Sequence, residues 1–115
     1  MTAETVGFTD PLLLLEQFLT GYWSARTRAN YAFIIGGWFT WCAGHKHDPM
    51  RDADPRVLER WITDMQHRPY AANTIAGRVS AVSAFYRWCV REQLLNRNPV
   101  EVIRRPARPS ESAVC

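Results

Sequence analysis

Four prolines mark where the helices of this chain are expected to begin and end. Pro11 and Pro55 each follow an aspartate, and an Asp-Pro pair predicts a helix start, because the carboxylate can cap free amides and proline suits the first helical position. Pro69 and Pro99 predict helix ends, because the residue before a proline is biased away from the helical conformation. These four prolines therefore set expected bounds for the helices.

Apolar residues recur between the prolines at the three- and four-residue steps of a helix. This pattern predicts four helices, over residues 11–21, 24–44 and 55–68 and from residue 72 to the Asn98-Pro99 pair. No segment combines the period-two alternation of a strand with the turn dipeptides of a hairpin. We therefore expect an all-α fold, with a flexible tail over residues 1–9, a helical domain over residues 10–103 and a basic tail over residues 104–115.

The five tryptophans can either build a core or stack on nucleic-acid bases. Four of them lie on or beside the predicted apolar stripes, so we interpret them as packing residues: Trp38, Trp41, Trp61 and Trp88. Trp23 lies in the turn between the first two helices, where the sequence favours neither role.

The cysteines and histidines argue against a metal site. The three cysteines are widely spaced and include no CxxC pair. Cys42, His45, His47 and Asp48 form one local cluster, but a zinc site usually needs a second group of ligands, and Cys42 faces the predicted core. We expect no metal and no cofactor, and the cysteine pattern indicates a reduced, intracellular protein.

Motifs of catalysis are also missing from the sequence. It contains no GxSxG, HExxH, P-loop or GxGxxG pattern, and its carboxylates are scattered over helix caps and solvent faces. It has neither the run of about 20 apolar residues that spans a membrane nor the basic-then-apolar start of a secretory signal. We expect a non-catalytic, cytoplasmic protein without a membrane partner.

The basic residues are almost all arginines, and they are unevenly distributed. The chain has 13 arginines, one lysine and a formal charge of +3. No basic residue precedes Arg26, whereas seven arginines and only three glutamates follow Gly77. This asymmetry indicates an anionic partner for the C-terminal half. The alternative is an arginine-rich sequence whose arginines are merely solvated.

Two of the predicted helices, over residues 24–44 and from residue 72 onward, carry polar and basic residues opposite their apolar stripes. The later helix has small residues there, Gly77, Ser80, Ala81 and Ala84, bordered by Arg78, Arg87 and Arg91. Small residues permit close approach to another surface, and helix-start amides can donate hydrogen bonds to phosphate. The predicted DNA contacts are Arg26, Thr27, Arg28, Asn30, Asn73, Thr74, Gly77, Arg78 and Arg87. The alternative is that Ser24 and Asn73 only cap their helices.

The order of these features resembles the N-terminal core-binding domain of tyrosine recombinases, the phage-integrase family. The family's Ser-x-x-Thr-x-x-x-Tyr helix start is matched by Ser24, Thr27 and Tyr31. A later run of Thr-Ile, Phe-Tyr, Asn-Pro and Arg-Arg-Pro is matched by Thr74, Ile75, Phe85, Tyr86, Asn98, Pro99, Arg104, Arg105 and Pro106. The resemblance covers about residues 10–108.

The resemblance implies a SAM-like, four-helix orthogonal bundle that forms one half of a C-shaped clamp on double-stranded DNA at a recombination site. The second and fourth helices would cross the major groove, and a separate catalytic domain of the same parent chain would cover the other face. It further implies an interdomain linker over residues 104–115, with Arg104 and Arg105 among the DNA contacts, and association with the nucleoid.

The same resemblance assigns two further roles. The first helix, rich in leucine at residues 12–15, would contact a neighbouring protomer on the DNA. The family's nucleophilic tyrosine belongs to the catalytic domain, so none of this chain's tyrosines takes its place: Tyr22, Tyr31, Tyr70 and Tyr86.

Two other functions are compatible with the sequence. One is a helical protein-interaction module that uses its apolar first helix and does not touch DNA. The other is a stand-alone, catalysis-free accessory or inhibitor of recombination.

Overall fold

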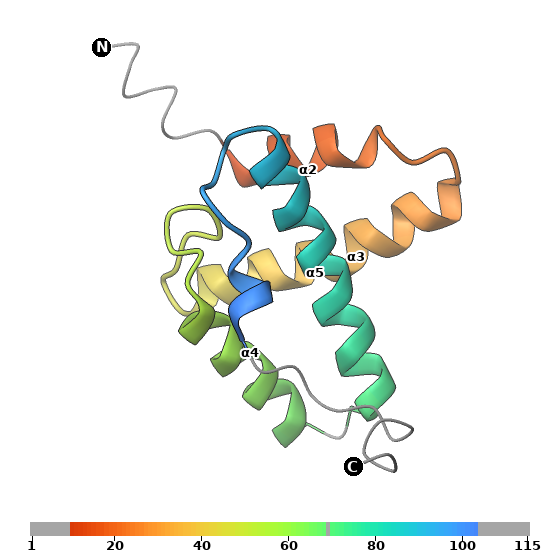
Figure 1. Cartoon of the computed structure of the whole chain (residues 1–115). Helices are drawn as coiled ribbons and strands as arrows, with labels where there is room; N and C mark the ends of the chain where they lie inside the picture. Colours follow the sequence, from red (N-terminus) through yellow and green to blue (C-terminus); the bar gives the residue numbers. More distant parts are fainter. Residues whose placement is uncertain (1–9, 69, 104–115) are drawn as a thin grey trace, which may run out of the picture.

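The computed structural model describes residues 10–68 and 70–103, which form four α-helices and one short 3-10 helix (Figure 1). The elements are α2 (Pro11–Leu19), α3 (Ala25–Gly44), α4 (Pro55–His67), α5 (Ala72–Arg91) and η1 (Pro99–Val102). These residues contain no strand, which confirms the all-α prediction. The predicted tails over residues 1–9 and 104–115 lie outside the described residues.

Three helices begin with the side-chain caps that the sequence predicts. The Leu12 amide donates to Asp10 Oδ1 at 3.0 Å, and the Arg56 amide donates to Asp54 Oδ1 at 2.8 Å. Ser24 Oγ accepts from the amide of Thr27 at 3.2 Å and so caps α3. Each cap satisfies a donor that has no partner within the helix, which fixes where the helix starts.

Two helices end in a motif that the sequence analysis did not predict. After α5, the Gln93 amide donates to the Val90 carbonyl and the Leu94 amide to the Cys89 carbonyl, with Gln93 at φ 63°. This is the Schellman arrangement of a helix C-terminus. The fourth helix therefore ends at Arg91 and not at the Asn98-Pro99 pair, which is a correction to the predicted boundary.

The end of α3 has the same geometry. The amides of Lys46 and His47 donate to the carbonyls of Ala43 and Cys42, and Lys46 has φ 63°. The helix ends at Gly44 as predicted, but the left-handed residue is Lys46 and not the glycine.

Helices α3 and α5 cross near the centre of the molecule, and their N-terminal halves extend away from the crossing (Figure 1). Helix α2 packs on both of them, and η1 lies against α4 and α5. Phe85 of α5 links three helices, because its ring lies 5.7 Å from Phe18 of α2 and 5.5 Å from Phe39 of α3. Edge-to-face packing of this kind is favourable between aromatic rings.

The tryptophans divide between core and surface. Trp38 and Trp61 are buried, and Trp41 and Trp88 are half-buried against the core, which confirms the packing interpretation. Trp23 is 97% exposed, in the turn between α2 and α3.

Buried polar groups connect the helices to the loops. The Tyr86 hydroxyl donates to the Pro49 carbonyl at 2.6 Å and accepts from Trp38 Nε1 at 3.0 Å. Asn98 donates from Nδ2 to both Ser83 Oγ and the Ser83 carbonyl at 3.1 Å, and its Oδ1 caps η1 at the Val100 amide. The Asn-Pro pair thus fastens the chain after α5 back onto the middle of that helix.

Candidate nucleic-acid interface

Helix α3 presents one exposed stripe along the side opposite the core. Arg26, Asn30, Phe33 and Gly37 follow one another at steps of four, three and four residues, which places them on one side of the helix, and all four are exposed. The stripe begins in the first turn, two residues after the Ser24 cap. It combines a cation, an amide and an aromatic ring within three helical turns.

Thr27 and Arg28 do not belong to this stripe. Thr27 is half-buried. Arg28 turns back on the chain, and its Nη1 donates to the carbonyls of Tyr22 at 2.6 Å and Trp23 at 2.8 Å. The guanidinium of Arg28 therefore holds the turn between α2 and α3. The hydrogen bond to the Trp23 carbonyl also fixes the backbone that carries the exposed Trp23 ring.

The start of α5 differs from the other helix starts. Its N-cap residue is Ala71, which has no side chain able to cap, and Asn73 and Thr74 are exposed at the second and third helical positions. The interpretation of Asn73 as the cap is therefore wrong, whereas that of Ser24 is correct. Uncapped amides at a helix start carry a partial positive charge that favours anions.

The small residues of α5 are only partly on the surface. Gly77 is exposed, and a Cβ at this position would meet no atom within 4 Å. Ser80 and Ala84 are half-buried, while Ala81 is buried in the core cluster. The expectation of an open small face is thus corrected at Ala81, because α5 packs against its neighbours over a wider arc than the apolar stripe alone.

Arg78 and Arg87 lie on opposite sides of α5, because nine residues correspond to two and a half helical turns. Arg78 is half-buried beside α3, with its Cζ 5.8 Å from the ring centre of Phe33 and 4.7 Å from that of Tyr70. Arg87 is exposed in the C-terminal half of α5. Arg104 and Arg105 lie outside the described residues.

A hollow of about 280 Å³ opens between α3, α4 and the start of α5. Phe33, Gly37, Tyr70 and Arg78 line it, together with Arg68 at the end of α4. Sequence reasoning missed Phe33 and Tyr70. The signal for Phe33 was present, because it is a large apolar residue seven positions after Arg26 and outside the apolar stripe.

Charge separates α3 and α5 from the rest of the described chain. The two helices together contain five arginines and no aspartate or glutamate, and neither has an acidic residue in its first turn. Helix α4, by contrast, carries Arg56 and Arg60 alongside Glu59 and Asp64. Net positive charge is therefore concentrated on the pair of crossing helices.

The residues considered as possible metal ligands make contacts within the fold. Cys42 is buried, His45 stacks on Trp41 at 4.1 Å between ring centres, and Asp48 accepts from the Met50 and Arg51 amides. Within residues 10–68 and 70–103, no three histidine, cysteine or acidic side chains converge in a way that could hold a metal ion. No helix among these residues has the length and apolar character needed to cross a membrane.

Buried ionisable groups are held in their neutral forms. Burial, with smaller contributions from Asp48 and Asp52, raises the pKa of the Cys42 thiol from 9.0 to about 12. Burial alone raises the pKa of Cys89 from 9.0 to about 12. Burial is the main cause that raises the pKa of Tyr86 strongly, with smaller contributions from Cys42, Cys89 and Asp48 and a small opposing one from the hydrogen bond with Trp38. These shifts oppose nucleophilic chemistry, which needs the anion.

Comparison with known proteins gives consistent matches. Residues 15–93 match the family described as phage integrase, N-terminal SAM-like domain. The chain is 28% identical over 101 residues to the tyrosine recombinase XerD of Yersinia pestis, which covers 84% of this chain and 33% of that protein. It is 30% identical over 105 residues to the tyrosine recombinase XerD of Chlorobaculum tepidum, which covers 91% of this chain and 32% of that protein.

A shorter region is more similar. Over 54 residues, the chain is 43% identical to the tyrosine recombinase XerC of Chlamydia trachomatis serovar L2, which covers 47% of this chain and 17% of that protein. The chain spans about a third of the length of the two XerD relatives. No solved structure gave a significant match.

Proposed function

This chain belongs to the phage integrase N-terminal SAM-like domain family, and from that premise we propose that it binds double-stranded DNA as the core-binding part of a tyrosine recombinase. The proposed contact surface is the N-terminal halves of α3 and α5. The observation that carries the proposal is the charge of these two helices, five arginines without a single carboxylate. A helix pair that merely faced water would have no reason to exclude acidic residues.

The geometry of the helix starts supports contact with phosphates. The crossing spreads the two N-terminal halves apart on the same side of the molecule (Figure 1). Asn73 and Thr74 provide donors beside the uncapped amides of α5, and Arg26 and Asn30 provide donors along α3. Contacts of this kind to the DNA backbone set position and affinity, and contacts to base edges set sequence preference.

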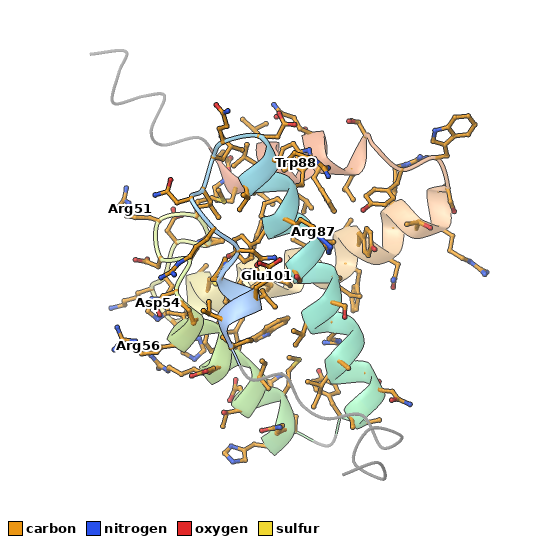
Figure 2. The ribbon with its side chains drawn as sticks, viewed as in Figure 1. Arg51, Asp54, Arg56, Arg87, Trp88 and Glu101 are labelled. Atoms are coloured by element: carbon orange, nitrogen blue, oxygen red, sulfur yellow. The ribbon has the colours of Figure 1, made fainter. Side chains whose placement is uncertain are left out.

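The proposal is tested by fluorescence anisotropy with labelled duplex DNA. We expect the 115-residue chain to bind, and Arg26→Ala to weaken binding on every sequence tested. Arg56→Ala is the charge-matched control, because Arg56 is exposed on α4, pairs with Asp54 at 3.6 Å and lies far from the start of α3 (Figure 2). Equal losses from both variants would point to net charge and refute a docking surface.

We propose that strand exchange belongs to a separate catalytic domain of the parent protein. Two of the tyrosines support this division of labour, because Tyr86 is buried and hydrogen-bonded and the pKa of Tyr22 is raised by burial and by Tyr31. The test is incubation of the chain with a nicked recombination substrate, followed by denaturing electrophoresis. A covalent adduct formed by these residues alone would refute the proposal.

A protein-interaction role for α2 is the second candidate. Leu12 and Leu13 are 57% and 52% exposed, and Leu12 borders a hollow between the start of α2 and the end of α3. We propose that these leucines contact a neighbouring protomer when several copies assemble on DNA. Analytical ultracentrifugation with and without DNA tests this, and Leu12→Glu should abolish any DNA-dependent association while leaving single-copy binding intact.

A further inference from the structure

The Arg78 guanidinium lies over two aromatic rings that come from different elements. Phe33 belongs to the exposed stripe of α3, and Tyr70 precedes α5 in the connection from α4. The Arg78 Cζ lies 5.8 Å from the Phe33 ring centre and 4.7 Å from that of Tyr70. Contacts between a guanidinium and ring faces are attractive within about 6 Å of the ring centre.

Both rings are more exposed than packing alone would favour. Phe33 is 69% exposed and Tyr70 is 37% exposed, so neither is needed to close the core. Arg78, in contrast, is half-buried. Among the described residues, Arg78 has no carboxylate within ion-pair distance and no protein acceptor for its N–H groups. A guanidinium that lies over aromatic rings and has no other partner among the described residues keeps N–H donors available for an external acceptor.

The surroundings favour an anion as that acceptor. Arg78 and Arg68 both line the hollow between α3, α4 and α5, and Gly37 opens its wall on the α3 side. The hollow also contains Asp64, which accepts from Trp41 Nε1 at 2.9 Å, and its one negative charge is outnumbered by the two arginines. A recessed arginine between two helices is better placed for an outlying phosphate than for a base edge deep in the groove.

We infer that Phe33 and Tyr70 are positioning residues, which hold the Arg78 guanidinium in place to bind one phosphodiester of the DNA backbone. The inference rests on the proposed DNA-binding function and specifies one contact within it. A guanidinium presents a fork of donors that matches two phosphate oxygens, and fixing it in advance reduces the entropy lost on binding. The uncharged rings thus contribute to an interaction that depends on charge.

The test compares the affinity for duplex DNA, and its salt dependence, across variants of the full 115-residue chain. Arg78→Ala should weaken binding about tenfold, as expected for loss of a charge-assisted hydrogen bond, and should lower the slope of log K against log salt by about 0.9. Tyr70→Ala and Phe33→Ala should each weaken binding severalfold and lower that slope, although neither changes the net charge. Arg78→Lys should restore the charge without restoring the affinity.

Controls separate positioning from a general loss of structure. Tyr70→Phe keeps the ring and should retain wild-type affinity, and Leu94→Ala removes a side chain of similar exposure, 41%, at the far end of α5 and should have no effect on binding. Thermal melting should show that all variants remain folded. The double variant Tyr70→Ala/Arg78→Ala should bind no more weakly than Arg78→Ala alone, because both changes remove the same contact.

The outcomes distinguish this inference from the function on which it rests. If the chain does not bind DNA, both are refuted. If Arg26→Ala weakens binding but Tyr70→Ala and Phe33→Ala do not, DNA binding stands and the positioning role is refuted. Additive losses in the double variant would also refute it. A loss confined to one base pair of the duplex would mean that Arg78 reads a base edge and does not hold a phosphate.

Discussion

The contacts of a single residue show whether folding explains its identity. Asn98 is buried and makes three hydrogen bonds within the protein, so its place in the Asn-Pro pair is explained by folding. Gly77 is the opposite case. A Cβ at this position would meet nothing within 4 Å, so no intramolecular contact of the described residues requires a glycine there.

Gly77→Ala should therefore change stability and DNA binding in opposite directions. Alanine is favoured over glycine inside a helix, so the free energy of unfolding should rise by about 0.5–1 kcal/mol. The added methyl group would stand between the α5 backbone and the proposed DNA surface, so affinity for DNA should fall. Chemical denaturation and anisotropy titration of the same sample measure the two effects.

Gly36→Ala provides a matched control for this substitution. Gly36 lies in the middle of α3, and a Cβ there would also meet nothing within 4 Å, but the residue is half-buried and not part of the exposed stripe. It should gain similar stability and leave DNA affinity unchanged. Equal DNA affinities for wild type, Gly36→Ala and Gly77→Ala would show that no surface approaches α5 closely at this point.

The two buried cysteines predict a pH dependence of stability. The pKa values of Cys42 and Cys89 are raised from 9.0 to about 12, so the folded protein keeps both protons in a range where the unfolded chain loses them. The free energy of unfolding should consequently fall as pH rises through about 9 toward about 12, and these thiols should contribute little pH dependence below about 8. Urea unfolding across this range measures the effect.

Alkylation of the same thiols provides an independent check. In a Cys115→Ser background, Cys42 and Cys89 should resist iodoacetamide at pH 8 and react only as the protein unfolds, because both are buried. Rapid labelling of the folded protein would show that these thiols are accessible.

Helix starts were easier to predict than helix ends, for a physical reason. A start depends on one short-range hydrogen bond, and the caps at Asp10, Ser24 and Asp54 can be read from the residue itself. An end depends on which residue adopts a left-handed backbone. Lys46 and Gln93 do so without being glycine or asparagine, so local sequence carries no signal for them.

Gln93→Gly should stabilise the fold. A left-handed backbone costs a residue other than glycine roughly 1–2 kcal/mol, and glycine removes that cost. Glycine also makes the unfolded chain more flexible, which offsets part of the gain in stability. We expect a net rise of about 0.5–1 kcal/mol in the free energy of unfolding, measured by urea titration. Gln93→Val should be destabilising, because a β-branched residue tolerates this backbone poorly. If both variants melted as wild type does, the Schellman end of α5 would not be formed in solution.

At the level of the whole molecule, the sequence predicted which helices carry the candidate site but not how their side chains meet. The positions of Arg26, Asn30 and Gly77 on exposed helix faces follow from periodicity alone. The use of Arg28 by the turn and the contact of Arg78 with Tyr70 depend on how distant segments approach each other. Helical periodicity predicts which side of its own helix a side chain lies on, but it does not predict which residue of another segment that side chain contacts.

The salt dependence of DNA binding follows from how many cations this arrangement leaves free. Of the five arginines on α3 and α5, Arg28 is bound to carbonyls within the turn. Arg26 and Arg78 lie on the proposed surface, whereas Arg87 and Arg91 lie in the C-terminal half of α5. Each phosphate neutralised contributes about 0.9 to the slope of log K against log salt, so the magnitude of the slope should be about 2 if only Arg26 and Arg78 contact phosphates and about 4 if all four arginines do, with micromolar or weaker affinity for non-specific duplex. Anisotropy titrations between low and physiological salt measure this slope.

A slope near zero would mean that binding does not use these arginines. A slope well above four would require phosphate contacts from other parts of the chain and would refute a surface limited to the two crossing helices.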